Sequence, residues 1–183
     1  MGTSLLGVAT WPHVGGTGLM PRPLMATDQI LSVLEETPVR LGALTSGLPE
    51  AVLHAAPAPG EWSVTEIVAH LRSCADMWGR AIRSMVETAH PTIRAVNPTT
   101  WIERTGYRQL ELAPSLSAFA SQRNELLAVL GQLPTRGWAR KATVLGAGKP
   151  LELTVHSYAA RLARHERTHW RQVAKTVGML TPD

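Results

Sequence analysis

The sequence predicts an all-α protein folded as a four-helix bundle, and two observations support this fold class. Four segments of the 183-residue chain repeat apolar residues at three- and four-residue spacing, which is the period of an amphipathic helix. The segments between them contain no strong strand pattern, internal repeat or low-complexity tract. Helices of this kind bury their apolar faces against one another, so a bundle is the expected architecture.

The first predicted helix begins near Thr27 or Asp28, both of which are suitable N-cap residues, and its apolar positions continue to Leu48. Pro38 interrupts this segment. Because proline lacks a backbone donor and its ring clashes with the preceding helical turn, we expect a kink or a restart at this point. A cluster of Pro and Gly at residues 57–60 then separates the first helix from the second.

The second predicted helix has the clearest start signal in the chain. Ser63 followed by Glu66 forms a capping box, in which each side chain satisfies a free backbone N–H of the first turn. Apolar residues then recur at helical spacing from Ile67 to Met85, and His70 lies on the same face. His70 is therefore predicted to face the interior of the bundle.

A long loop is predicted between the second and third helices, because residues 88–114 contain three prolines and no convincing period. The third helix follows Pro114 and Ser115 and stops before Pro134. Short glycine-containing pieces after Thr135 predict a small hairpin. The last helix begins at Leu151 or Thr154 and runs to Val177, with Gly178 as the residue that ends it.

Composition and charge argue against several classes of partner. The formal net charge is +4, but the arginines are scattered among acidic residues and lysine occurs only at Lys141, Lys149 and Lys175. A nucleic-acid-binding surface requires a denser basic patch, so we expect no nucleic acid partner. No apolar run approaches the length of a membrane span, and the single cysteine, Cys74, excludes an internal disulfide. A cytoplasmic location is the expectation.

The first 26 residues are rich in Gly and Pro and have no helical period. They also lack the basic start and apolar stretch of a secretory signal. We therefore expect a flexible extension over residues 1–26 and one bundle domain over residues 27–183. Met20 and Met25 are alternative start positions to Met1.

Three histidines form the candidate site. His165 and His169 are four residues apart on the predicted inner seam of the last helix, so both rings lie on one face. An isolated pair of this kind is more often exposed or hydrogen-bonded than bound to metal. However, His70 on the second helix adds a third inward imidazole, and three protein ligands with one open position are the donor set of a catalytic metal site. The sequence therefore predicts a divalent metal bound by His70, His165 and His169.

The other candidate ligands are weaker. His13, His54, His90 and His156 lie in the extension, in loops or off the seam. Cys74 is one helical turn from His70 and could replace a histidine, although buried free cysteine is usually a core residue.

Residues 165–169 also match the H-E-x-x-H signature of zinc metalloproteases, in which the glutamate is the general base. Those enzymes take their third ligand from further along the chain, where Asp183 is the only acidic residue after His169. Glu166 is also rotated about 100° from His165 around a helix, so it need not face the metal. The protease interpretation is therefore disfavoured, and the catalytic role of Glu166 stays open.

Two stretches resemble the DinB/YfiT-like superfamily: PGEWSVTEIVAHL at residues 59–71 and ARHERTHWRQV at residues 163–173. The likeness extends over about residues 28–178. It implies a four-helix bundle that binds a divalent ion, often zinc or nickel, through three histidines, which correspond to His70, His165 and His169. Members of the superfamily commonly dimerise, so a homodimer is expected.

The resemblance also implies a function. Members with assigned activities are thiol-dependent transferases or isomerases that use low-molecular-weight thiols, so the leading hypothesis is a metal-dependent S-transferase acting on a thiol and an electrophile. Arg123 and Arg161 are candidate contacts for an anionic substrate, and Trp62 and Trp78 are candidates to line its cavity. The alternatives are a metal-dependent hydrolase and a non-catalytic small-molecule-binding or stress-response module. The sequence specifies neither the substrate nor the metal.

Overall fold

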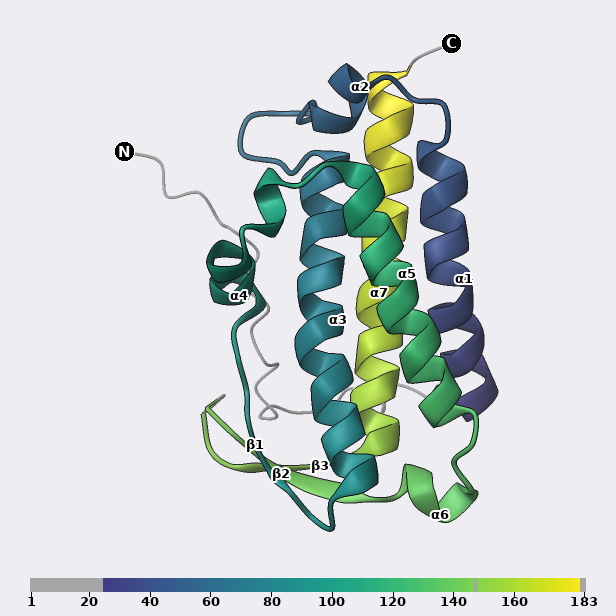
Figure 1. Ribbon diagram of the computed structural model, residues 1–183, viewed down its shortest axis with the longest axis vertical. Coiled ribbons are helices and arrows are strands. Elements are labelled where there is room, and N and C mark those ends of the chain that lie inside the picture. The colour runs from purple at the N-terminus through teal and green to yellow at the C-terminus, as the bar shows by residue number, and fades with distance from the viewer. Residues whose placement is uncertain (1–24, 147, 182–183) are drawn as a thin grey trace, which may run out of the picture.

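The computed structural model describes residues 25–146 and 148–181. Four long helices, α1 (Thr27–Thr45), α3 (Val64–Glu87), α5 (Leu112–Leu130) and α7 (Val155–Leu180), lie side by side (Figure 1). Helix α3 packs against α5 and α7, and α1 packs against the same two helices. The predicted four-helix bundle is therefore confirmed, with α3 and α7 as neighbours. Residues 1–24, assigned to the extension, lie outside the described residues.

The helix starts follow from local side-chain chemistry. The predicted capping box of α3 is present, since Ser63 Oγ accepts from the backbone N–H of Glu66 and the Glu66 carboxylate accepts from that of Ser63. Helix α7 has the same arrangement between Thr154 and Ser157, so Thr154 is its N-cap and the helix begins at Val155, close to the predicted start. These two caps fix the starts of the helices that carry the three histidines.

Some helix boundaries differ from the prediction. Helix α1 has Ala26 as its N-cap and continues through Pro38 without a restart. Helix α5 begins at Leu112, so Pro114 lies in its first turn, where the missing N–H is not needed. Helix α7 continues through Gly178 to Leu180, and Gly178 does not adopt the positive φ of a terminating glycine.

The stretch predicted as a long loop contains three short elements: β1 (Thr92–Arg94), α4 (Pro98–Thr105) and the 3₁₀ helix η1 (Tyr107–Gln109). Strand β1 pairs in parallel with β2 (Lys141–Leu145), which pairs antiparallel with β3 (Leu151–Thr154). The β2–β3 pair confirms the predicted hairpin. The sheet lies at one end of the bundle, and β3 leads directly into α7 (Figure 1). Short helices α2 (Glu50–His54) and α6 (Thr135–Trp138) complete the fold.

The core consists of two groups of buried apolar side chains. One group, nearer the sheet, includes Trp78, Ile82 and Leu162, and the other includes Leu71 and Phe119. On α3, His70 and Cys74 directly precede Leu71 and Ala75 of the second group, and both side chains are buried. Among the described residues, no helix is both long enough and apolar enough to cross a bilayer.

Candidate metal centre

Helices α3 and α7 bring the three predicted histidines together. The Nε2 atom of His165 lies 3.1 Å from Nε2 of His70 and 3.1 Å from Nε2 of His169. The centroids of the His70 and His169 rings are 4.9 Å apart. His70 is only 6% exposed, and the other two side chains are half-buried. The three imidazoles therefore converge at the interface between the two helices.

The spacing of the nitrogens can be compared with the spacing that a shared cation requires. A neutral imidazole has one N–H donor and one acceptor nitrogen, so Nε2 of His165 can make a good hydrogen bond with only one of its two neighbours. Nitrogens that bind one tetrahedral zinc ion at about 2.0–2.1 Å lie about 3.3 Å from one another. The two approaches of 3.1 Å fit that arrangement, so the donor set fits a divalent ion.

One of the rings is held by a partner on its outer side. Nδ1 of His169 lies 2.9 Å from Oε1 of Gln172, one turn further along α7. With Nδ1 donating to this amide oxygen, Nε2 of His169 keeps a free lone pair directed at the cluster. Nδ1 of His70 and Nδ1 of His165 are buried without a hydrogen-bond partner among the described residues.

Burial also keeps the rings neutral. Desolvation and the neighbouring His169 lower the pKa of His70 to about 3. The pKa of His165 is lowered strongly by burial and by the two other histidines, and burial lowers that of His169 as well. Neutral imidazoles at pH 7 have lone pairs available for a metal.

Cys74 lies at the edge of the cluster. Its Sγ atom is 3.5 Å from Nε2 of His70 and 4.0 Å from Nε2 of His165. The ligand atoms of His70, Cys74 and His165 lie within 4.8 Å of one another, so this trio is a second donor set that could hold a metal. Burial raises the pKa of the Cys74 thiol, which keeps it protonated at neutral pH.

Glu166 has a different environment from the two histidines beside it in the sequence. Its carboxylate is fully buried and forms an ion pair with Arg123 of α5. Burial raises the pKa of Glu166, and the Arg123 charge opposes this shift. Arg123 is also a predicted substrate contact, but its side chain is 1% exposed and pairs with Glu166, so it does not face an open cavity.

The DinB superfamily pattern matches residues 33–173, which is most of the chain. The chain belongs to the DinB superfamily. The fold agrees with a solved structure of YfiT from Bacillus subtilis, described as a probable metal-dependent hydrolase with an unusual four-helix bundle topology. The TM-score is 0.69 at 19% sequence identity, over 87% of this chain and 94% of YfiT. No curated protein matches the chain in sequence.

Two tryptophans flank the histidine cluster of this DinB superfamily protein. The Trp62 ring lies 5.0 Å from the His70 ring and 6.4 Å from the His169 ring, measured between centroids. The Trp78 ring meets the His165 ring edge-on, with 4.9 Å between the centroids. The Arg161 guanidinium lies 5.8 Å from the centroid of the Trp78 ring. Trp62, Trp78 and Arg161 are therefore all close to the cluster.

The remaining histidines of this DinB superfamily member have other partners. His54 pairs with Glu111, His90 contacts Thr143 and Glu152, and His156 packs against Trp138. His13 lies outside the described residues. In the structure the three predicted ligands lie together, and His54, His90 and His156 lie apart from them.

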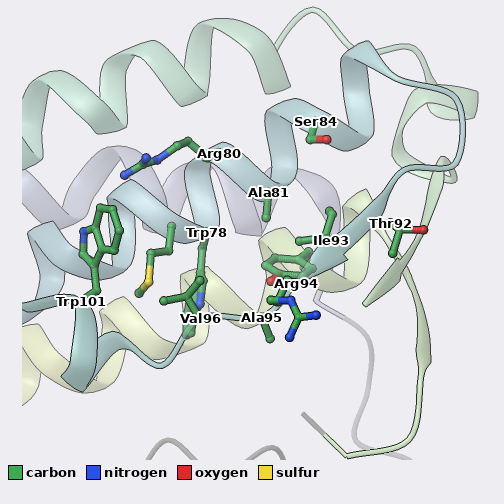
Figure 2. Close-up of a pocket in the computed structure, with 12 residues that line it drawn as sticks. Trp78, Arg80, Ala81, Ser84, Thr92, Ile93, Arg94, Ala95, Val96 and Trp101 are labelled. Atoms are coloured by element: carbon green, nitrogen blue, oxygen red, sulfur yellow. The ribbon is translucent and has the colours of Figure 1, made fainter. Parts of the chain in front are cut away.

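Two features of the site were missed at the level of sequence. One is the Gln172 contact with His169, which only the spacing of three residues between them could have indicated. The other feature is a pocket of about 310 Å³ beside Trp78, walled on one side by β1 (Figure 2). Strand β1 lies in the stretch predicted as loop, so nothing local in the sequence indicated this wall.

Proposed function

We propose that this DinB superfamily protein is a metal-dependent thiol S-transferase whose divalent metal, zinc or nickel, is held by His70, His165 and His169. The observation that carries the proposal is the convergence of three neutral imidazole nitrogens, with Nε2 of His165 3.1 Å from each of the other two. Three histidine ligands leave a position for a substrate group.

A divalent ion in this site would lower the pKa of a thiol or water bound to it and so supply a nucleophile at neutral pH. The side chains around the site have supporting roles. Gln172 orients the His169 ring, and the Trp62 and Trp78 rings pack against the ligand rings and limit the access of water. In the proposed reaction, a low-molecular-weight thiol loses its proton to solvent. Its sulfur then forms a bond to an electrophilic carbon while the bond from that carbon to the leaving group breaks, and the leaving group keeps the electron pair.

A metal-dependent hydrolase is the second candidate. It is favoured by the fold similarity to YfiT, which is described as a probable hydrolase of this kind. The same three imidazoles would serve that reaction, in which water replaces the thiol as the nucleophile. Only the reaction itself separates the two candidates, because their ligand sets are identical.

Metal content tests the site. We expect the purified protein to contain about one divalent ion per chain, measured by inductively coupled plasma mass spectrometry, and His165→Ala to lose it. His156→Ala is the matched control, since this histidine lies on the same helix but packs against Trp138. Equal metal content in all three proteins would refute the site.

The reaction is tested with the metal-loaded protein. We expect it to conjugate a low-molecular-weight thiol to an aryl halide or epoxide, and the rate to fall after chelation and in His165→Ala. Hydrolysis of aryl esters or amides without thiol dependence would instead favour the hydrolase. If neither activity exceeds that of His165→Ala, the enzyme proposal fails.

A further inference from the structure

The pocket beside Trp78 opens between α3, β1 and α4. Trp78 and Ala81 of α3 form one side, Ile93 and Arg94 of β1 form another, and Trp101 of α4 lies at one end (Figure 2). Tyr158 of α7 also contributes to the wall. The volume of about 310 Å³ falls at the lower end of the range for small-molecule sites.

Trp78 connects this pocket to the histidine cluster. Its indole lines the pocket and also meets the His165 ring at 4.9 Å between centroids. A molecule bound in the pocket would therefore contact the ring that packs on His165, with Trp78 between it and the candidate metal centre.

The shape and chemistry of the lining favour a flat apolar body. Two indoles and one phenol, from Trp78, Trp101 and Tyr158, stand beside the aliphatic side chain of Ile93. Aromatic rings bind another ring through stacked or edge-to-face contacts, which add to the burial of apolar surface. A bicyclic aromatic group is small enough for a pocket of this volume.

The charge of the lining favours an anion. Both charged residues that line the pocket, Arg80 and Arg94, are basic, and none of its lining residues is acidic. Arg80 already has partners within the protein. Its Nε donates to the backbone carbonyl of Asp76 at 2.9 Å, and its guanidinium stacks on Trp101. Arg94 is exposed at the β1 side and is the better placed cation for a ligand carboxylate.

We propose that this pocket binds an aromatic carboxylate, with its ring against Trp78 and its carboxylate at Arg94. Binding in this pocket does not require the reaction proposed for the metal centre. The two proposals can therefore fail separately.

Calorimetric titration of the full chain tests the binding site, with naphthalene-2-carboxylate as the charged probe and naphthalene-2-methanol as its neutral counterpart. We expect the carboxylate to bind about three- to tenfold more tightly, which is the effect of a partly exposed ion pair. Arg94→Gln should reduce the carboxylate to the affinity of the alcohol without changing the alcohol. Arg136→Gln on α6, an exposed arginine away from the pocket, is the matched control and should change neither.

Ala81→Leu tests the location independently of charge, because the larger side chain would fill part of the pocket and weaken both probes. Circular dichroism of each variant checks the fold. Binding that is unaffected by both Arg94→Gln and Ala81→Leu, or no binding of either probe at millimolar concentration, would overturn the proposal. We expect chelation of the metal to leave probe binding intact, so loss of catalysis and loss of binding are distinguishable.

Discussion

Arg123 of α5 and Glu166 of α7 form an ion pair in which each side chain is 1% exposed. The pair lies next to the candidate metal centre in the sequence, because Glu166 directly follows His165, yet its carboxylate is directed to a different helix. The contact joins two helices that are diagonal in the bundle, since each of them packs mainly against α1 and α3. We interpret it as a structural contact that fixes the rotation of α7 about its own axis. This rotation determines the direction in which His165 and His169 point.

Breaking this ion pair should destabilise the fold. Replacing one partner of a buried pair leaves an uncompensated buried charge, which typically costs about 3–5 kcal/mol. We therefore expect Arg123→Met to lower the free energy of unfolding by about this amount. The measurement is urea denaturation of the protein after a chelator has removed its metal. The double variant Arg123→Met/Glu166→Leu should recover most of the loss, because no charge then remains buried. A single variant as stable as the parent protein would refute the structural role.

Gln172 should control metal affinity through His169. Removing the acceptor for Nδ1 frees the imidazole to rotate and change tautomer, and losses of this kind reduce metal affinity about 10- to 100-fold. We expect Gln172→Ala to show this loss in competition with a chromophoric chelator, while Gln172→Glu, which keeps an acceptor, retains the affinity. Thr168→Ala on the exposed side of α7 is the control and should leave the affinity unchanged. Equal affinities for Gln172→Ala and the parent protein would remove Gln172 from the site.

The parts of the site that the sequence predicted depend on local patterns. The capping box at Ser63 fixes where α3 begins, and helical spacing then places His70 on its inner face. The same spacing puts His165 and His169 together on α7. Local rules therefore predicted both the fold class and the three histidines that converge.

The parts that could not be predicted depend on contacts between distant segments. Strand β1 has only three residues and exists because it pairs with β2, so its own sequence contains too little pattern to indicate a strand. Arg123 could be a surface, substrate-binding or buried residue on its own helix, and only the position of Glu166 on α7 decides among these. The pocket beside Trp78 forms only when β1 and α4 pack on α3, so local sequence patterns could not predict it either.

Asp76 should hold α4 and η1 against the bundle. Its carboxylate accepts from Trp101 Nε1 at 3.0 Å, from Tyr107 Oη at 2.8 Å and from the Gln122 amide. Asp76→Ala leaves these donors without their acceptor, so we expect a loss of about 2 kcal/mol in the free energy of unfolding. Amide hydrogen exchange should become faster over residues 98–109. Glu125→Gln, an exposed ion-pair residue, is the control and should cost less than about 1 kcal/mol.

Cys74 should not be a metal ligand. Its Sγ is 4.0 Å from Nε2 of His165, further than either histidine nitrogen, and burial raises the pKa of its thiol, so deprotonation has a cost that an imidazole ligand does not have. We expect the cobalt-substituted protein to lack a thiolate-to-cobalt charge-transfer band in the near ultraviolet. Cys74→Ala should bind about one cobalt ion per chain with the same visible spectrum as the parent protein. A charge-transfer band that disappears in Cys74→Ala would instead show that the thiolate completes a four-ligand site, and it would argue against an open position for substrate.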